Sequence, residues 1–206
     1  GIPFEYNIGG MSINKSLFRK AGIDPEKEEN IPETWEEVGE IGGKIFEAGK
    51  EDGKINFEGF DWYYHHDDWE RILVRTVFAQ YVAKFINEEG EVVVASDGAI
   101  EAFQMMKDMI YEYKTGDPNR VIGADTRGWQ FSYGNIAINT GMAGPIGTLN
   151  LEWDKEDYKA VPYPHPKGRD PVVRLRCHGF IVNKDISEEK QIEAWKFINY
   201  LTKQWQ

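Results

Sequence analysis

Residues 11–23 have the sequence MSINKSLFRKAGI, in which a short apolar run leads directly into a helix start. Asn14 stands where an N-cap is expected, because its short polar side chain can accept a hydrogen bond from a backbone N–H of the first turn. Gly22 closely follows two basic residues, which is typical of a helix end. The stretch therefore predicts a strand over residues 8–13 and a helix that begins at residue 15 and stops at Gly22.

Residues 32–37, PETWEE, contain the next helix start. Thr34 and Glu37 have the spacing of a capping box, in which each side chain bonds to the backbone N–H of the other residue. Apolar residues then recur at the spacing of one helix face. Residues 39–44 (GEIGGK) faintly resemble a phosphate-binding loop, but such a loop lies between a strand and a helix start. We expect these small residues to permit close packing instead.

The rest of the chain alternates between strand-like and helix-like patterns. Strand-like runs occupy residues 54–61, 91–95, 135–139, 158–162 and 172–183. Helical patterns run from Asp67 or Asp68 to Phe85, from Ser96 to just before Gly116, and from Ser187 to Leu201. This alternation predicts an α/β fold with a mixed, mainly parallel sheet flanked by helices.

Charge and cysteine content exclude several classes of function. The chain has 24 Lys and Arg against 35 Asp and Glu, a net charge of −11, so its average field repels a nucleic-acid backbone. Cys177 is the single cysteine, which excludes an intrachain disulfide and a thiolate-rich metal site. No run approaches the roughly 18 apolar residues of a membrane helix. Residues 1–5 (GIPFE) lack the pattern of a signal peptide, so we expect a removed signal or a whole N-terminal section before them.

Three stretches carry the motifs of a known family. Residues 11–23 and 32–37 resemble its Asn-Lys-x-Leu-Phe-x-Lys-Ala-Gly helix and its Pro-x-Thr-Trp-x-Glu helix start. Residues 131–138 (FSYGNIAI) are similar to its Phe-x-x-Gly-x-Ala-Ala-Met stretch, although Asn135 and Ile136 depart from the usual lysine and alanine. Residues 179–184 (GFIVNK), with Ala-Trp-x-Phe from residue 194, resemble its Gly-x-x-Ile strand and the helix that follows. In these motifs and their order, nearly the whole chain resembles family 1 extracellular solute-binding proteins, the maltose-binding-protein-like sugar receptors of bacterial ABC importers.

This resemblance implies the fold of a type II periplasmic binding protein, in which crossing strands join two α/β lobes that close around a ligand. Residues 1–176 would be the second lobe with the first crossing segment. Residues 177–206 would be the return crossing and a helix that belongs to the first lobe, and the remainder of that lobe would be absent. We therefore expect one lobe of a two-lobe protein, with a last helix that lacks its native partner.

The function that the resemblance implies is non-catalytic binding of a small solute, a mono- or oligosaccharide, for delivery to ABC transporter permease subunits by cleft closure. Such a receptor needs no cofactor and no metal. It acts as an extracellular or periplasmic monomer, secreted or lipid-anchored, and meets the membrane only through that anchor or the transporter. Two alternatives stay open: a carbohydrate-acting hydrolase that uses Asp61, Asp68 or another carboxylate pair, and a ligand-sensing domain of a signalling system.

The loop 62–69, WYYHHDDW, combines aromatic rings with His and Asp at the place where the family offers an acid and a stacking ring. A sugar has apolar faces edged by hydroxyl groups, so rings and hydrogen-bonding side chains suit it. His66, Asp68 and Trp69 are therefore candidate ligand contacts. The alternative is that Asp68 caps the helix and Trp69 belongs to the core. A metal site is not expected, because adjacent residues rarely point at one ion, although a surface calcium ion is compatible with the sequence.

Two further candidate pairs stand at the ends of predicted strands. Tyr6 and Asn7 precede the first strand, where the family's crossing segment touches the ligand, and the alternative for Asn7 is to order the turn. Asn139 and Thr140 stand where many family members carry a stacking tryptophan. Residues 139–145 contain no aromatic side chain, so we expect Asn139 and Thr140 to hydrogen-bond the solute.

Residues 174–179, RLRCHG, alternate between charged and apolar side chains, which places Arg174, Arg176 and His178 on one face of a strand. Two arginines on one face can bind a carboxylate or a phosphate bidentately, so an acidic sugar is an alternative ligand. The competing interpretation is a pair of surface arginines neutralised by nearby acids. Cys177 and His178 are not a catalytic pair, because neighbours on a strand face opposite sides.

Overall fold

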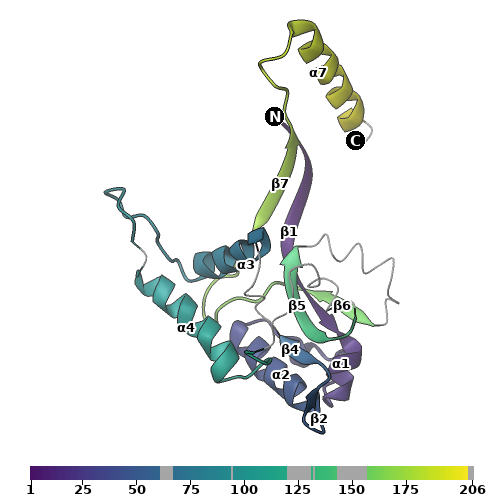
Figure 1. Ribbon diagram of the computed structural model, residues 1–206, viewed down its shortest axis with the longest axis vertical. Helices are drawn as coiled ribbons and strands as arrows, with labels where there is room; N and C mark the ends of the chain where they lie inside the picture. The colour runs from purple at the N-terminus through teal and green to yellow at the C-terminus, as the bar shows by residue number, and fades with distance from the viewer. Residues whose placement is uncertain (61–66, 94, 120–130, 132, 143–156, 204–206) are drawn as a thin grey trace. The chain divides into compact units, whose positions relative to one another are not determined.

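The structure is a computed structural model that describes residues 1–60, 67–93, 95–119, 131, 133–142 and 157–203. At residues 7, 67–73, 141–142 and 176 it describes the backbone alone. The chain forms two compact units (Figure 1). The larger unit is Gly9–Arg174, and the smaller unit combines Gly1–Ile8 with Leu175–Gln206. Strand β1 (Ile2–Asn14) contributes residues to both units.

The larger unit is built on a mixed sheet whose strands follow the order β4-β5-β1-β6. The strands that join β1 are β4 (Glu58–Phe60), β5 (Ile136–Met142) and β6 (Tyr158–Val161). β4 and β5 are parallel, whereas β1 is antiparallel to β5 and to β6. The predicted α/β fold with a mixed sheet flanked by helices is confirmed.

The expectation that the sheet is mainly parallel does not hold for the described strands. Parallel neighbours need a long crossover connection, and β4 and β5 are joined by one that contains α3 (Asp67–Gln80) and α4 (Asp97–Tyr111). β1 instead lies between β5 and β6 and runs against both. The alternation of strands and helices along the sequence does not reveal this direction.

The strand-to-helix junction predicted around Asn14 is confirmed, but the strand is longer than expected. Asn14 Oδ1 accepts a 3.1 Å hydrogen bond from the backbone N–H of Leu17, as an N-cap does. Helix α1 (Lys15–Lys20) follows, and Gly22 just beyond it has a φ of 75°. β1 begins at Ile2 because residues 2–8 pair with β7 (Leu175–Phe180). β7 lies far along the chain, so the sequence around residues 2–8 does not indicate this pairing.

Helix α2 (Trp35–Ala48) begins with the predicted capping box. The backbone N–H of Glu37 donates to Thr34 Oγ1 at 3.3 Å, and Glu37 Oε2 accepts from the backbone N–H of Thr34 at 3.0 Å. Gly59 lets β4 approach α2 closely, and Gly39 and Gly43 of α2 leave room for Tyr113 beside the helix. A Cβ added to Gly59 of β4 would stand 1.9 Å from the carbonyl oxygen of Gly42. The small residues of α2 therefore serve close packing, as expected.

Other predicted elements are shorter than their sequence patterns. Helix α3 ends at Gln80 rather than at Phe85, and Val82 has a φ of 55°, which a helix does not tolerate. The described residues of the predicted strand 91–95, which are 91–93 and 95, form no strand, and the pairing there is an isolated bridge between Ile86 and Val92. The remaining short elements are η1 (Glu28–Asn30), β2 (Lys50–Glu51) and β3 (Lys54–Ile55).

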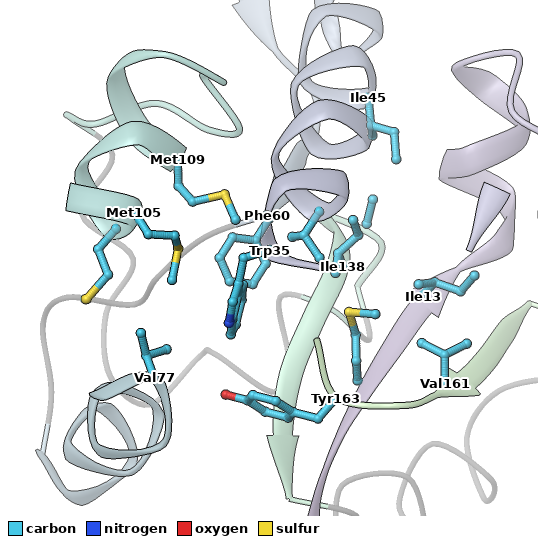
Figure 2. Close-up of a cluster of buried hydrophobic side chains, with 14 of the residues drawn as sticks. Ile13, Trp35, Ile45, Phe60, Val77, Met105, Met109, Ile138, Val161 and Tyr163 are labelled. Carbon is cyan, nitrogen blue, oxygen red and sulfur yellow. The ribbon is translucent and has the colours of Figure 1, made fainter. Parts of the chain in front are cut away.

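The hydrophobic core of the larger unit is formed by the sheet and helices α1 to α4 (Figure 2). Trp35 of α2 lies edge-on to Phe60, with 6.0 Å between ring centroids, and edge-on to Tyr163, with 5.7 Å. All three side chains are more than nine-tenths buried. Tyr163 follows β6, so this packing fixes the chain after β6 against the start of α2.

The smaller unit consists of an antiparallel pair of strands and a helix. Residues 2–8 of β1 pair with β7, with Tyr6 opposite Cys177 and Asn7 opposite Arg176. Helix α7 (Glu188–Lys203) follows β7 and has large exposed apolar side chains, namely Ile192, Trp195, Phe197 and Tyr200. None of the described helices is long and apolar enough to cross a membrane.

Candidate functional site

Several segments of the larger unit reach the same edge of its sheet. β4 and β5 are parallel, with Phe60 opposite Ile138, so both strands end at this edge. β1 runs the other way, and its Gly9 is opposite Met142 at the end of β5. Ligands of open α/β sheets bind beyond the carboxyl ends of the strands. We therefore take this edge, from Gly9 to the ends of β4 and β5, as the candidate ligand edge.

Thr140 lies on β5 near the candidate ligand edge and is 7% exposed. It is opposite Met11 of β1, so its side chain points to the face of the sheet that carries the core. Its hydroxyl is beside the phenol of Tyr163. Even so, Thr140 Oγ1 is buried and makes no hydrogen bond of acceptable geometry with the described part of the chain. Because buried hydroxyl groups are normally hydrogen-bonded, Thr140 has unused hydrogen-bonding capacity.

Tyr163 and Arg174 both lie against Gly9 at this edge. A Cβ added to Gly9 would stand 3.5 Å from Tyr163 Cδ2 and 3.7 Å from the Arg174 carbonyl oxygen. The backbone N–H of Gly9 donates to that oxygen at 2.9 Å, which fixes the backbone of Arg174. Burial raises the pKa of the Tyr163 phenol well above its usual value, and the Thr140 hydroxyl offsets only part of that rise. Tyr163 is therefore a neutral hydrogen-bonding group at physiological pH.

Arg174 is partly buried, and its Nη1 is fully buried with no hydrogen-bond partner among the residues that the structure describes. It precedes β7, which begins at Leu175, and belongs to the larger unit. Arg176 and His178 belong to β7 and to the smaller unit. β7 therefore begins one residue later than a strand that carries all three residues would. Arg174 lies directly before it, where its carbonyl oxygen still accepts from Gly9 of β1.

Gln80, which the sequence patterns did not single out, holds the segment between β6 and β7 in place. It is the last residue of α3 and is 2% exposed. Its Nε2 donates to the carbonyl oxygens of Pro164 at 2.7 Å and Val172 at 2.9 Å, and its Oε1 accepts from Trp35 Nε1 at 2.7 Å. The sequence does contain a signal that could have identified Gln80. It is a polar residue three positions after Val77, so it falls on the apolar face of the predicted helix.

Asn139 and Thr140 are neighbours on β5 and therefore point to opposite faces of the sheet. Asn139 is opposite Ser12 of β1 and is partly buried. Thr140 points to the face that carries Tyr163, and Asn139 does not. The structure thus separates the two residues of this predicted pair.

The loop that supplies three candidate residues lies largely outside the described residues. His66 is outside them, as is Asp61 of the alternative hydrolase. Asp68 and Trp69 lie in the first turn of α3, where the backbone alone is described. Their assignment as ligand contacts stays a prediction. Within the described ranges, no three His, Cys, Asp or Glu side chains are grouped as a metal site requires.

Four candidates lie on the paired strands of the smaller unit. Tyr6 is exposed. Asn7 and Arg176 are opposite each other in the register. His178 Nδ1 is 3.0 Å from Glu5 Oε2 on the neighbouring strand. The His178 ring therefore already has a partner within its own unit.

Residues 2–204 match the family of bacterial extracellular solute-binding proteins. The chain belongs to this family. A putative binding protein of Brucella abortus (strain 2308) is 30% identical over 213 aligned residues, which cover the whole chain and 47% of that protein. The sn-glycerol-3-phosphate-binding periplasmic protein UgpB of Salmonella typhimurium is 22% identical, over 98% of the chain and 44% of its own length.

Solved structures of solute-binding proteins share the fold. Maltose-bound MalE3 of T. maritima aligns with a TM-score of 0.74 at 23% identity, over 97% of this chain and 49% of that one. UgpB from Mycobacterium tuberculosis, in complex with glycerophosphocholine, aligns with a TM-score of 0.71 at 16% identity, over 96% and 47%. The chain spans about half the length of the relatives it matches. Its fold is that of one lobe of a type II periplasmic binding protein, as the resemblance implied.

The family is described as extracellular solute-binding proteins, and the Brucella and Salmonella relatives are named as binding proteins. A binding site of this kind needs donors and acceptors at fixed positions more than acid–base chemistry. Thr140 and Arg174 offer such groups, and the Gln80 hydrogen bonds fix the segment that ends in Arg174.

Proposed function

We propose that this chain provides one wall of the ligand cleft in a non-catalytic solute-binding protein. The solute is a small carbohydrate or carbohydrate derivative, and closure of the cleft presents it to the permease subunits of an ABC importer. The candidate ligand edge carries the proposal. In a chain of the solute-binding family, the ends of β4 and β5 reach this edge together with Gly9. The backbones of Thr140 and Arg174 lie at or near it, and each residue has a buried polar atom that the described residues leave unpaired.

The division into two units supports an assignment of the lobes. We assign Gly9–Arg174 to the second lobe, and the smaller unit to the crossing strands and a helix of the first lobe. The exposed apolar side chains of α7 support this assignment, because a stable amphipathic helix needs a partner for its apolar face. The relatives are about twice as long as this chain and have room for the rest of such a lobe. The assigned boundary lies two residues before the expected one at residue 176.

The solutes named for similar proteins support a carbohydrate-sized ligand. MalE3 is bound to maltose, a solute-binding protein from Thermotoga lettingae is bound to α-D-tagatose, and UgpB is named for sn-glycerol-3-phosphate. All three solutes are small and rich in hydroxyl or phosphate oxygens. Donors held at fixed positions, such as those of Thr140 and Arg174, suit oxygens of this kind.

The other candidate residues complete the proposed site. His66, Asp68 and Trp69 would provide hydrogen bonds and a stacking ring from the loop and the first turn of α3. Tyr6, Asn7, Arg176 and His178 would contact the solute from the crossing strands. Asn139 has the least support, because it points away from the face that carries Thr140 and Tyr163.

We further propose that the protein works in the extracellular or periplasmic space, as a secreted or lipid-anchored monomer. The description of its family as extracellular supports this location, and the relative UgpB is a periplasmic protein by name. The net charge of −11 disfavours a nucleic-acid partner. Contact with the membrane would be limited to the anchor and the transporter.

A ligand screen with the native protein tests the proposal. The melting temperature is measured with mono- and oligosaccharides, sugar acids and sugar phosphates, and with peptides and polyamines as competing classes. A ligand that binds only the folded state stabilises it by RT ln(1 + [L]/Kd), so a true shift must grow with ligand concentration. Shifts with carbohydrates support the proposal, and shifts with peptides or polyamines alone contradict the substrate class.

Recovery of the bound solute separates a receptor from an enzyme. A receptor binds its solute stoichiometrically and releases it unchanged after long incubation. Turnover of a glycoside at a measurable rate would contradict the non-catalytic assignment and favour the hydrolase.

A further inference from the structure

Two buried polar atoms lack a hydrogen-bond partner among the described residues, and both come from residues whose backbones lie at or near the candidate ligand edge. They are Thr140 Oγ1 and Arg174 Nη1. The two residues come from different parts of the chain and meet around Tyr163, whose phenol is beside the Thr140 hydroxyl. Its ring and the Arg174 backbone both contact the Cβ position of Gly9. Thr140 and the backbone of Arg174 are therefore both close to Tyr163 and Gly9.

The backbone of Arg174 is fixed on both sides. Its carbonyl oxygen accepts from Gly9, and the carbonyl oxygen of Val172, two residues earlier, accepts from the buried Gln80. A guanidinium is planar and presents its donors in a fixed arrangement, so less freedom is lost per hydrogen bond formed. The backbone that carries the Arg174 side chain is thus held in place before a ligand binds.

Arg169 lies in the same segment as Arg174, and its guanidinium has structural partners. Its guanidinium forms an ion pair with Glu101 and lies over the ring of Tyr81, with 5.0 Å between Cζ and the ring centroid. Arg174 has neither kind of partner in the part of the chain that the structure describes, although the protein has 35 acidic residues. A guanidinium nitrogen buried without an acceptor is destabilising, and more so than a neutral donor.

We propose that Arg174 and Thr140 form a subsite for an anionic group, so that the solute carries a carboxylate or a phosphate. This inference rests on the proposed function and narrows its substrate class. The guanidinium donates charge-assisted hydrogen bonds to the anion, and the Thr140 hydroxyl donates one more. A neutral sugar hydroxyl would also accept a hydrogen bond from Arg174, but it would leave the positive charge without a counter-charge.

Matched ligands test the subsite in the native protein. Isothermal titration compares glucose with glucuronate and glucose 6-phosphate, galactose with galacturonate, and glycerol with sn-glycerol 3-phosphate. We expect at least one anionic member to bind about 10- to 100-fold more tightly than its neutral counterpart, the range for a hydrogen bond to a charged group. The carboxylate and phosphate members show which anion the subsite takes.

The variant Arg174→Gln should abolish most of this preference, because it removes the charge; it should weaken binding of the anionic member far more than binding of the neutral member. Arg169→Gln is the matched control, and its preference should equal that of the wild type. If Arg174→Gln does not fold, Arg174→Lys together with the wild-type dependence of Kd on NaCl replaces it. The Lys variant should keep part of the preference, and salt should weaken binding of the anionic ligand alone.

The outcomes separate this inference from the proposed function. Tight binding of a neutral sugar with no gain from its acid or phosphate overturns the anion subsite and leaves the carbohydrate receptor in place. If the preference for the anionic member survives Arg174→Gln, or if NaCl does not change anion binding, other residues bind the anion. Either result also overturns the anion subsite. Failure of every ligand in the panel, and of the wider carbohydrate screen, contradicts the proposed function together with this inference.

Discussion

The indole Nε1 of Trp35 donates a 2.7 Å hydrogen bond to Oε1 of Gln80, a residue 45 positions further along the chain. Both side chains are almost fully buried. Because Gln80 also bonds the carbonyl oxygens of Pro164 and Val172, one amide group connects α2, α3 and the segment that ends in Arg174. The geometry of the candidate ligand edge therefore depends on a residue that need not touch the ligand.

Gln80→Leu should destabilise the larger unit by about 2–4 kcal/mol, because it leaves the indole N–H and the Pro164 carbonyl oxygen buried without their Gln80 partner and removes the part-buried bond to Val172. Urea unfolding followed by tryptophan fluorescence measures the loss. Gln104→Leu is the control, since Gln104 is exposed on α4 and its amide donates to Asp108 of the same helix. Equal stability of the two variants would show that the buried bonds are dispensable.

Gly59→Ala should destabilise the protein by more than about 2 kcal/mol, because the new methyl group would overlap the backbone of Gly42 in α2. The matched control is Gly10→Ala on β1, where a Cβ meets nothing within 4 Å and we expect a change within about 0.5 kcal/mol. Thermal unfolding compares the two variants. Similar melting temperatures would mean that α2 moves away from β4 at little cost.

The capping box should make part of the stability of α2 depend on pH. Burial opposes ionisation of Glu37, but hydrogen bonds from the backbone of Glu33 and Thr34 and from the Thr34 hydroxyl together lower the pKa of its carboxyl below the usual value. The folded state then favours the carboxylate. That contribution is complete above the unfolded-state pKa and is lost as the pH falls through the lower folded-state pKa.

We expect the stability advantage of the wild type over Glu37→Gln to be present at pH 7 and to shrink by pH 3. Its size should be less than about 1 kcal/mol, since the site is largely solvated. Urea unfolding at both pH values measures it. Glu40→Gln, an exposed change on the same helix, controls for the lost charge. An advantage that grows toward low pH would contradict the sign of the shift.

Trp69→Ala should weaken solute binding by about 0.5–1.5 kcal/mol or more if Trp69 stacks on the sugar. Titration of the solute identified in the screen measures the affinity, and the melting temperature of the ligand-free variant reports on folding. Unchanged affinity in a folded variant would remove Trp69 from the site. A loss of folding would instead support its role in the core.

Short-range patterns in the sequence were sufficient to predict where helices α1 and α2 begin. Asn14 and Thr34 cap helices as predicted, because an N-cap and its partner lie within three residues of each other. Pairing between distant segments has no such signal. Residues 2–8 form a strand because β7 lies beside them, and Val82 ends α3 with a conformation that is unusual for a β-branched residue.

The candidate site could be predicted only in part, because contacts between distant segments of the chain also shape it and leave no local signal. Thr140 was singled out from its place after a strand motif, and it lies at the candidate ligand edge. Arg174 was singled out by charge alternation, but the unit boundary that separates it from Arg176 and His178 is a tertiary feature. Gln80 was missed, since its partners lie 45, 84 and 92 positions away.

The glycines of α2 also bear on the order in which this protein acquires its structure. Each internal glycine lowers the intrinsic stability of a helix by about 1 kcal/mol relative to alanine, and α2 contains three, at positions 39, 42 and 43. A peptide of residues 35–48 should therefore be mostly unstructured in water. The carbonyl oxygen of Tyr113 occupies the space beside Gly43, so a contact needed by α2 is supplied by a segment 70 residues downstream. During synthesis, α2 should consequently become protected from hydrogen exchange only after the chain has been made past α4.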